Sequence, residues 1–163
     1  MYIAETERMV LRELNLQDAA SVVRIFSDPR SMEFAPMAVT SEISIAQDFI
    51  GWHRRNYKDF GYGSWAVILK DSQQFVGQAG LVPHHAGVEV FYSFIPEYWG
   101  RGLATEAAMA CLRHGWEQLK LRRLISVLHP QNHRAIRVAE KIGMKPSGII
   151  RMWNRENLLY ESA

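Results

Sequence analysis

The stretch Pro-Glu-Tyr-Trp-Gly-Arg-Gly-Leu-Ala-Thr-Glu-Ala, residues 96–107, decides the fold because it joins a run of short strands to a long helix. Gly100 and Gly102 have no Cβ, so the backbone can turn tightly here and approach a ligand closely. The helix that begins at Leu103 offers unpaired N–H groups and the positive end of its dipole, which together favour phosphate oxygens. Taken alone, the stretch predicts either a phosphate-binding turn or a strand-to-helix turn without a ligand.

The spacing of apolar residues predicts the elements on both sides of this stretch. Strands are predicted over residues 8–14, 65–69, 75–81, 88–95, 123–128, 147–152 and 157–160, and helices over residues 15–27, 41–60, 103–119 and 135–142. The three closely linked strands in the middle predict an antiparallel meander, and a strand–helix–strand crossover follows it. We therefore expect one α/β (α+β) domain over residues 1–163, with a mixed, mostly antiparallel sheet of six to seven strands and helices on both faces.

Composition and charge exclude several classes of protein. The formal net charge of +2 is too small to indicate a nucleic-acid or membrane partner. Neither a signal peptide nor a membrane span is visible, and the single Cys111 allows no intrachain disulfide, so we expect a cytoplasmic protein with this cysteine buried. No metal site is expected, because His84 and His85 would face opposite sides of a strand and a proline separates His129 from His133.

Two segments resemble one enzyme family. Residues 89–107, EVFYSFIPEYWGRGLATEA, and residues 132–144, NHRAIRVAEKIGM, are together similar to motifs of the GNAT superfamily of N-acetyltransferases, and more narrowly of its RimJ/RimL branch. The resemblance implies the GNAT fold and direct transfer of an acetyl group from acetyl-CoA to a primary amine, without an acyl-enzyme. The acceptor is either a protein N-terminal amine or a small-molecule amine. A non-catalytic acyl-CoA-binding module is the alternative, because alanines stand at 135 and 139, where the family commonly has Ser and Tyr.

The resemblance also implies which residues bind the coenzyme. The glycine turn and the following helix start would hold the pyrophosphate, and the end of the preceding strand would lie along the pantetheine arm. A backbone N–H of that strand would polarise the thioester carbonyl. The residues expected to bind the coenzyme are Phe94, Ile95, Trp99, Gly100, Arg101, Gly102, Leu103, Ala104, Thr105, Asn132 and Arg137.

Glu89 is the first candidate for the general base, since it lies on the same strand where the family pattern has an acidic residue. The alternative is a strand glutamate that only hydrogen-bonds the neighbouring strand. Tyr160 and Tyr92 are weaker candidates for the proton donor to the leaving thiolate, because most tyrosines in such a chain are packing residues.

Acceptor-side residues are expected from the first two helices and the final hairpin, and these include Phe34, Trp52, Trp65 and Trp153. The final strand ends close to the C-terminus, so it is either incomplete or placed at the edge of the sheet in a homodimer.

Overall fold

The computed structural model describes residues 2–162, and its strands form a single sheet in the order β1-β2-β3-β4-β5-β6-β8-β7. The strands are β1 (Tyr2–Glu5), β2 (Met9–Glu13), β3 (Ser64–Leu69), β4 (Phe75–His84), β5 (Gly87–Phe94), β6 (Leu124–Leu128), β7 (Lys145–Met152) and β8 (Arg155–Glu161). The pairing of β5 with β6 is parallel, and the other strand pairs of the described chain are antiparallel. This is the mixed sheet that the sequence predicts.

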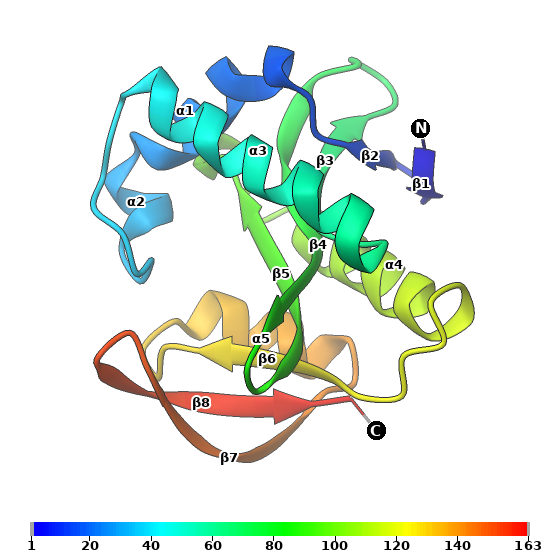
Figure 1. Ribbon diagram of the computed structural model, residues 1–163, viewed down its shortest axis with the longest axis vertical. Coiled ribbons are helices and arrows are strands. Elements are labelled where there is room, and N and C mark those ends of the chain that lie inside the picture. Colours follow the sequence, from blue (N-terminus) through cyan, green and yellow to red (C-terminus); the bar gives the residue numbers. More distant parts are fainter. Residues whose placement is uncertain (1, 163) are drawn as a thin grey trace.

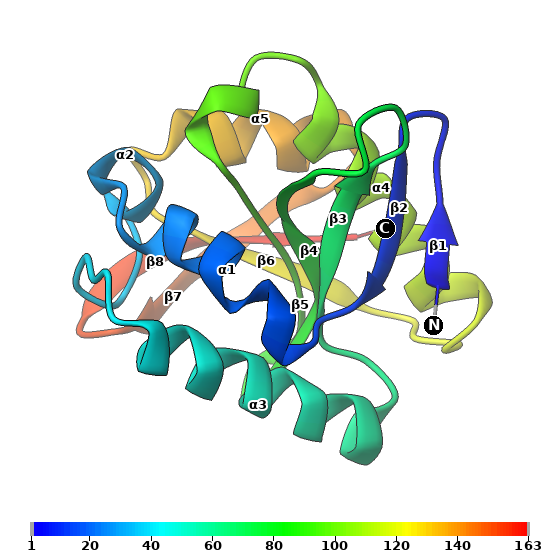
Figure 2. The same cartoon turned by 90° about the horizontal axis from the view of Figure 1, so that it is seen from above.

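Helices cover both faces of the sheet (Figures 1 and 2). The helices are α1 (Ala19–Phe26), α2 (Pro29–Met32), α3 (Ile43–Phe60), α4 (Leu103–Glu117) and α5 (His133–Lys141), with short 3-10 turns over Leu16–Asp18 and Pro96–Tyr98. Residues of α4 and α5 share one hydrophobic cluster with the sheet, whereas α1, α2 and α3 contribute to a second cluster. The sheet therefore has a core on each face, and any opening through it connects the two sides.

The N-terminal half shows why the chain turns where it does. Asn15 accepts a hydrogen bond from the N–H of Gln17, and Asp18 accepts one from the N–H of Asn15, so the two side chains cap the helix start reciprocally. Asp18 is buried and also forms a bidentate ion pair with Arg12 of β2, at 2.8 and 2.9 Å. Gly61 ends α3 in the left-handed conformation, directly after the predicted last residue of this helix, 60.

The sheet has eight strands, not the six to seven expected, because the sequence prediction missed β1. This strand has only four residues and no alternating pattern of burial, so it carries little sequence signal. The expectation for the final strand was also wrong in part. β8 lies inside the sheet between β6 and β7, and the edge strands of the sheet are β1 and β7.

Two further expectations can be compared with the structure. Cys111 lies on α4 and is fully buried in the hydrophobic cluster between this helix and the sheet, as predicted. Within residues 2–162, no helix combines the length and apolar character that crossing a membrane requires.

A glycine in β4 provides a test of how closely the central strands pack. A Cβ on Gly80 would lie 2.1 Å from the carbonyl oxygen of Gly63 and 2.6 Å from the Cα of Ser64. Because these neighbours are backbone atoms, we expect Gly80→Ala to lower the free energy of unfolding by about 3 kcal/mol. Gly51→Ala is the matched control, since its Cβ would meet only Arg55 Nη1 at 3.6 Å within α3 and should add about 0.5–1 kcal/mol. Denaturant unfolding measures both, and equal effects would contradict this packing.

Candidate active site

The sheet opens between its two parallel strands. β5 and β6 pair only at Val88 with Leu124 and at Glu89 with Ile125, although β5 continues to Phe94. Beyond this point β6 runs across the direction of β5 (Figure 1). Backbone groups on the facing edges of the two strands therefore lose their ladder partners and become available to a ligand.

A cavity of about 760 Å³ occupies this opening. Its size lies within the range of small-molecule sites. It is lined from both sides of the sheet: by α1, the segment 30–37 and α3 on one side, and by α4 and α5 on the other. Of the residues expected to bind the coenzyme, it is lined by Phe94, Trp99, Gly100, Gly102, Leu103, Ala104, Thr105, Asn132 and Arg137.

The start of α4 forms one mouth of the cavity. Gly100 and Gly102 have φ angles of 79° and 76°, a left-handed conformation that disfavours residues with a Cβ. Gly102 is the N-cap residue, and no side chain of the described residues caps this helix. The N–H groups of the first turn therefore point out of the helix end and favour an anion.

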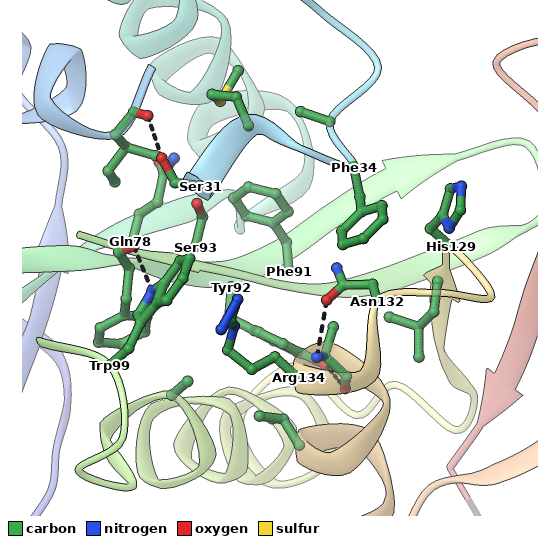
Figure 3. A pocket seen from close by; sticks show the side chains of 18 of the residues that line it. Ser31, Phe34, Gln78, Phe91, Tyr92, Ser93, Trp99, His129, Asn132 and Arg134 are labelled. Atoms are coloured by element: carbon green, nitrogen blue, oxygen red, sulfur yellow. Dashed lines mark hydrogen bonds between the residues drawn. The ribbon is translucent and has the colours of Figure 1, made fainter. Parts of the chain in front are cut away.

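Cations from α5 line the same part of the cavity, namely Arg134, Arg137 and Lys141. The guanidinium carbon of Arg134 lies 3.8 Å from the ring centroid of Trp99 (Figure 3), within cation–π distance. Trp99 also donates its indole N–H to the carbonyl oxygen of Phe94 at 2.9 Å, which holds the glycine turn against the end of β5. Arg101 does not line the cavity, and its guanidinium lies over the ring of Tyr98 instead.

The role expected for Ile95 is wrong. Its N–H donates to the carbonyl oxygen of Val76 on β4 at 2.9 Å, and its side chain is buried in the cluster on the opposite face. Backbone groups alternate between the two edges of a strand, so the N–H groups of Tyr92 and Phe94 point towards the opening instead.

Glu89 lines the cavity from the last position of β5 that pairs with β6. Its carboxylate accepts a hydrogen bond from the N–H of Val127 at 3.0 Å, and His84 Nε2 lies 3.9 Å from the same oxygen. Burial raises the pKa of Glu89 to about 7, against the opposing effect of the Val127 hydrogen bond. A carboxylate with this pKa is suited to accept a proton near neutral pH.

His84 is held in one orientation beside this carboxylate. Its Nδ1 accepts a hydrogen bond from the N–H of Ala86 at 3.2 Å, so in the neutral ring the proton is on Nε2, which faces Glu89. Burial and the neighbouring His85 lower the pKa of His84, which favours this neutral form. The ring therefore contributes a hydrogen-bond donor beside Glu89.

The two tyrosines are placed differently from each other. Tyr92 lines the cavity, but its hydroxyl donates to the carbonyl oxygen of Ala135 at 2.8 Å, and burial raises its pKa well above the ordinary value. Tyr160 lies in the hydrophobic core opposite Ser126 and does not line the cavity.

Asn132 lines the cavity, where its Oδ1 accepts a hydrogen bond from the N–H of Ala135 and caps α5 (Figure 3).

On the other side of the sheet the cavity is mostly apolar. Phe34 and Trp153 line it as expected, and the Phe34 ring stacks on His129 with centroids 4.7 Å apart (Figure 3). The expectation for Trp65 and Trp52 was wrong: Trp65 is fully buried under α4, and Trp52 lies outside the cavity lining on α3.

Sequence reasoning missed the lining residues Ser31, Gln78, Phe91 and Ser93, all labelled in Figure 3. Phe91 and Ser93 alternate with period two from Glu89, so the position of Glu89 on its strand could have identified them. Gln78 could not be found this way, because it lies on β4 and joins the site only through its pairing with Ser93.

Comparison with known proteins assigns the family. The model of the acetyltransferase (GNAT) domain matches residues 8–145. The chain belongs to this family. It is 34% identical over 161 residues to YkkB of Bacillus subtilis (strain 168), an uncharacterized protein, covering 96% of this chain and 92% of that protein.

Solved structures share the same fold. A GNAT-family acetyltransferase from Bacillus anthracis superposes with a TM-score of 0.84 at 29% identity, covering 99% of this chain and 97% of the other. Mycobacterium smegmatis RimJ, solved in complex with CoA-disulfide, gives a TM-score of 0.78 at 22% identity, covering 94% of this chain and 80% of that one. The RimJ/RimL resemblance thus extends to the fold.

Substitution of Gly102 tests whether the start of α4 binds the coenzyme. A β-branched residue is strongly disfavoured at positive φ, so Gly102→Val should displace the N–H groups that follow it. We expect at least about tenfold weaker binding of coenzyme A, measured by calorimetry, which corresponds to about 1.4 kcal/mol. Gly61→Val is the matched control, because Gly61 has a similar φ of 81° but caps α3 outside the cavity lining. Equal losses of affinity in the two variants would contradict a specific role for the turn.

Proposed function

We propose that this protein is an N-acetyltransferase that moves the acetyl group of acetyl-CoA to a primary amine by direct attack, with Glu89 as general base. The observation that carries the proposal is the opening between β5 and β6, which is lined by cations beside the start of α4 and by a carboxylate of raised pKa where the strands part. Membership of the GNAT family supports the same reaction.

The donor side of the cavity fits a coenzyme A molecule. The free N–H groups of α4 and the side chains of Arg134 and Arg137 would bind the phosphates. The exposed edge of β5 at Tyr92 and Phe94 would pair with the amides of the pantetheine arm, as a further strand would. Solved relatives bound to coenzyme A share this fold.

The chain's own residues would handle the proton. Bound acetyl-CoA supplies an activated acyl group, the nitrogen–carbon bond forms, and the carbon–sulfur bond breaks with release of the thiolate. Glu89 would take the proton that the amine loses, directly or through a water molecule. A backbone N–H of Tyr92 or Phe94 on the open edge of β5 would donate to the developing oxyanion. The hydroxyl of Tyr92 is directed at Ala135, and Tyr160 is outside the cavity, so we assign neither as the proton donor.

The acceptor is a protein N-terminal amine or a small-molecule amine, consistent with the RimJ fold and with the cavity on the α1–α3 side. We also propose that the protein acts in the cytoplasm, without nucleic-acid or membrane partners. A homodimer would use an edge strand of the sheet, β1 or β7.

Removal of the proposed base is the first test. Glu89→Gln should lower the rate of thiol release from acetyl-CoA by about 10²- to 10⁴-fold, since a general base contributes this much. Coenzyme A affinity should be unchanged. The matched control is Glu97→Gln, which removes an exposed carboxylate from the turn between β5 and α4. Coenzyme A binding without thiol release from any amine, in wild-type protein, would instead support a non-catalytic acyl-CoA-binding module.

The pH dependence is a second, independent test. Only the ionised carboxylate can accept a proton, so kcat/KM, which reports the free enzyme, should fall about tenfold per pH unit below the Glu89 pKa of about 7 and level off above it. The acceptor amine also titrates, so we would measure the ratio of wild-type to Glu89→Gln rates between pH 5.5 and 9. That ratio cancels the titration of the amine. A ratio that stays constant over this range would rule out Glu89 as the base.

A further inference from the structure

The cavity is lined by many more positively charged side chains than negatively charged ones. Among its described lining residues, Glu89 is the one carboxylate, whereas five side chains are cationic: Arg30, Arg134, Arg137, Lys141 and Arg155. The three from α5 lie on the donor side, beside the mouth at α4. Arg30 and Arg155 remain on the side where the acceptor would bind.

Arg30 is already neutralised, but Arg155 is not. Arg30 forms a bidentate ion pair with Asp28, at 2.7 and 3.1 Å, and lies 3.6 Å from Glu97. Within residues 2–162, no carboxylate lies within 4.0 Å of the Arg155 guanidinium. The acceptor side of the cavity therefore has one cation without a counter-ion.

Several contacts fix the orientation of this guanidinium. Arg155 Nη2 donates to the carbonyl oxygen of Phe34 at 2.7 Å, and its Nε donates to Asn157 Oδ1 at 3.0 Å. Asn157 is itself buried and donates to the carbonyl oxygens of Met152 and Arg155, at 3.2 Å each. The Trp153 ring lies 5.5 Å from the guanidinium carbon. No hydrogen-bond acceptor among residues 2–162 contacts Nη1, so its hydrogens are available on a side chain whose conformational freedom is already restricted.

The rest of this half of the cavity is mostly apolar, with walls that include Phe26, Met32, Phe34, Phe49, Phe91 and Trp153. Ser31, Gln78 and Ser93 are uncharged polar residues on the same side. A single carboxylate can pair with one ammonium group, so an acceptor with several ammonium groups would place the others near Arg155 or against apolar walls. Both placements are unfavourable, which argues against polyamine acceptors.

We propose that the acceptor is a free amino acid with an apolar side chain, whose carboxylate binds Arg155 while its amino group faces Glu89. A guanidinium forms strong, directional hydrogen bonds with a carboxylate, and a single unpaired cation matches its single negative charge. The proposal rests on the proposed acetyltransferase function and specifies its acceptor.

The test compares matched acceptors that differ only in the carboxylate. Thiol release would be measured with phenylalanine, leucine and methionine, with their amides, with spermidine, and with a tetrapeptide that has an apolar first residue and an amidated C-terminus. In wild-type protein we expect kcat/KM for each amino acid to exceed that of its amide at least tenfold. Arg155→Met should abolish this preference, chiefly by raising KM, and Arg155→Lys should restore part of it. Arg151→Met is the matched control, an exposed arginine on the same hairpin.

A purely structural role for Arg155 gives a different result. Arg155 also joins the β7–β8 hairpin to the segment after α2, so a purely structural role predicts that its loss lowers all rates equally. Equal loss for amino acids and amides would overturn the proposal, as would a wild-type preference for the amides, spermidine or the tetrapeptide.

Calorimetry separates failure of this inference from failure of the proposed function. With coenzyme A bound, wild-type protein should bind phenylalanine, and Arg155→Met should bind it at least tenfold more weakly. Turnover of spermidine alone would leave the acetyltransferase function standing and overturn only the assignment of the acceptor. Binding of phenylalanine through Arg155 without turnover of any amine would uphold the subsite and overturn the function. Absence of both binding and turnover would overturn both.

Discussion

The site depends on one constraint: β5 and β6 are parallel, and their hydrogen-bonded ladder stops after two residue pairs although both strands continue. Buried backbone groups without partners are costly, so an interrupted ladder must be completed by side chains, water or a ligand. On β5 the carbonyl oxygen of Phe94 accepts a hydrogen bond from the indole N–H of Trp99, and that of Val90 accepts one from the Ser126 hydroxyl at 3.5 Å. The N–H groups of Tyr92 and Phe94 face the cavity.

Glu89 links this interruption to the chemistry. Continued pairing would bring the N–H of Val127 to the backbone of β5, but this N–H donates to the Glu89 carboxylate instead. The two interpretations of Glu89 in the sequence, a base and a partner of the neighbouring strand, are therefore compatible. The bond to β6 fixes the carboxylate at the point where the strands part, and the burial that follows from this position raises its pKa to about 7.

The sequence predicted the parts of the site that local chemistry determines. The glycine turn and the start of α4 follow from residue types and spacing alone. The errors came from long-range pairing. Ile95 was misassigned because its N–H bonds β4, and Tyr160 because the pairing of β8 with β6 places it in the core. The sequence gives no indication of the role proposed for Arg155, because that role depends on the absence of a nearby carboxylate in the folded chain.

The raised pKa of Glu89 means that the protonation state that favours folding is not the one that the proposed reaction needs. Its folded pKa of about 7 exceeds the ordinary 4.5, so the native state binds the proton more tightly than the unfolded chain does. This contribution to stability is complete below pH 4.5 and is lost as the pH rises through 7, which makes the ionised, reactive form the less stable one. An ammonium group that enters the cavity would lower the pKa of Glu89, because its positive charge favours the ionised carboxylate. Binding of the acceptor would therefore ionise the proposed base. Because the lining has one carboxylate, one amino group of the acceptor is enough for this effect.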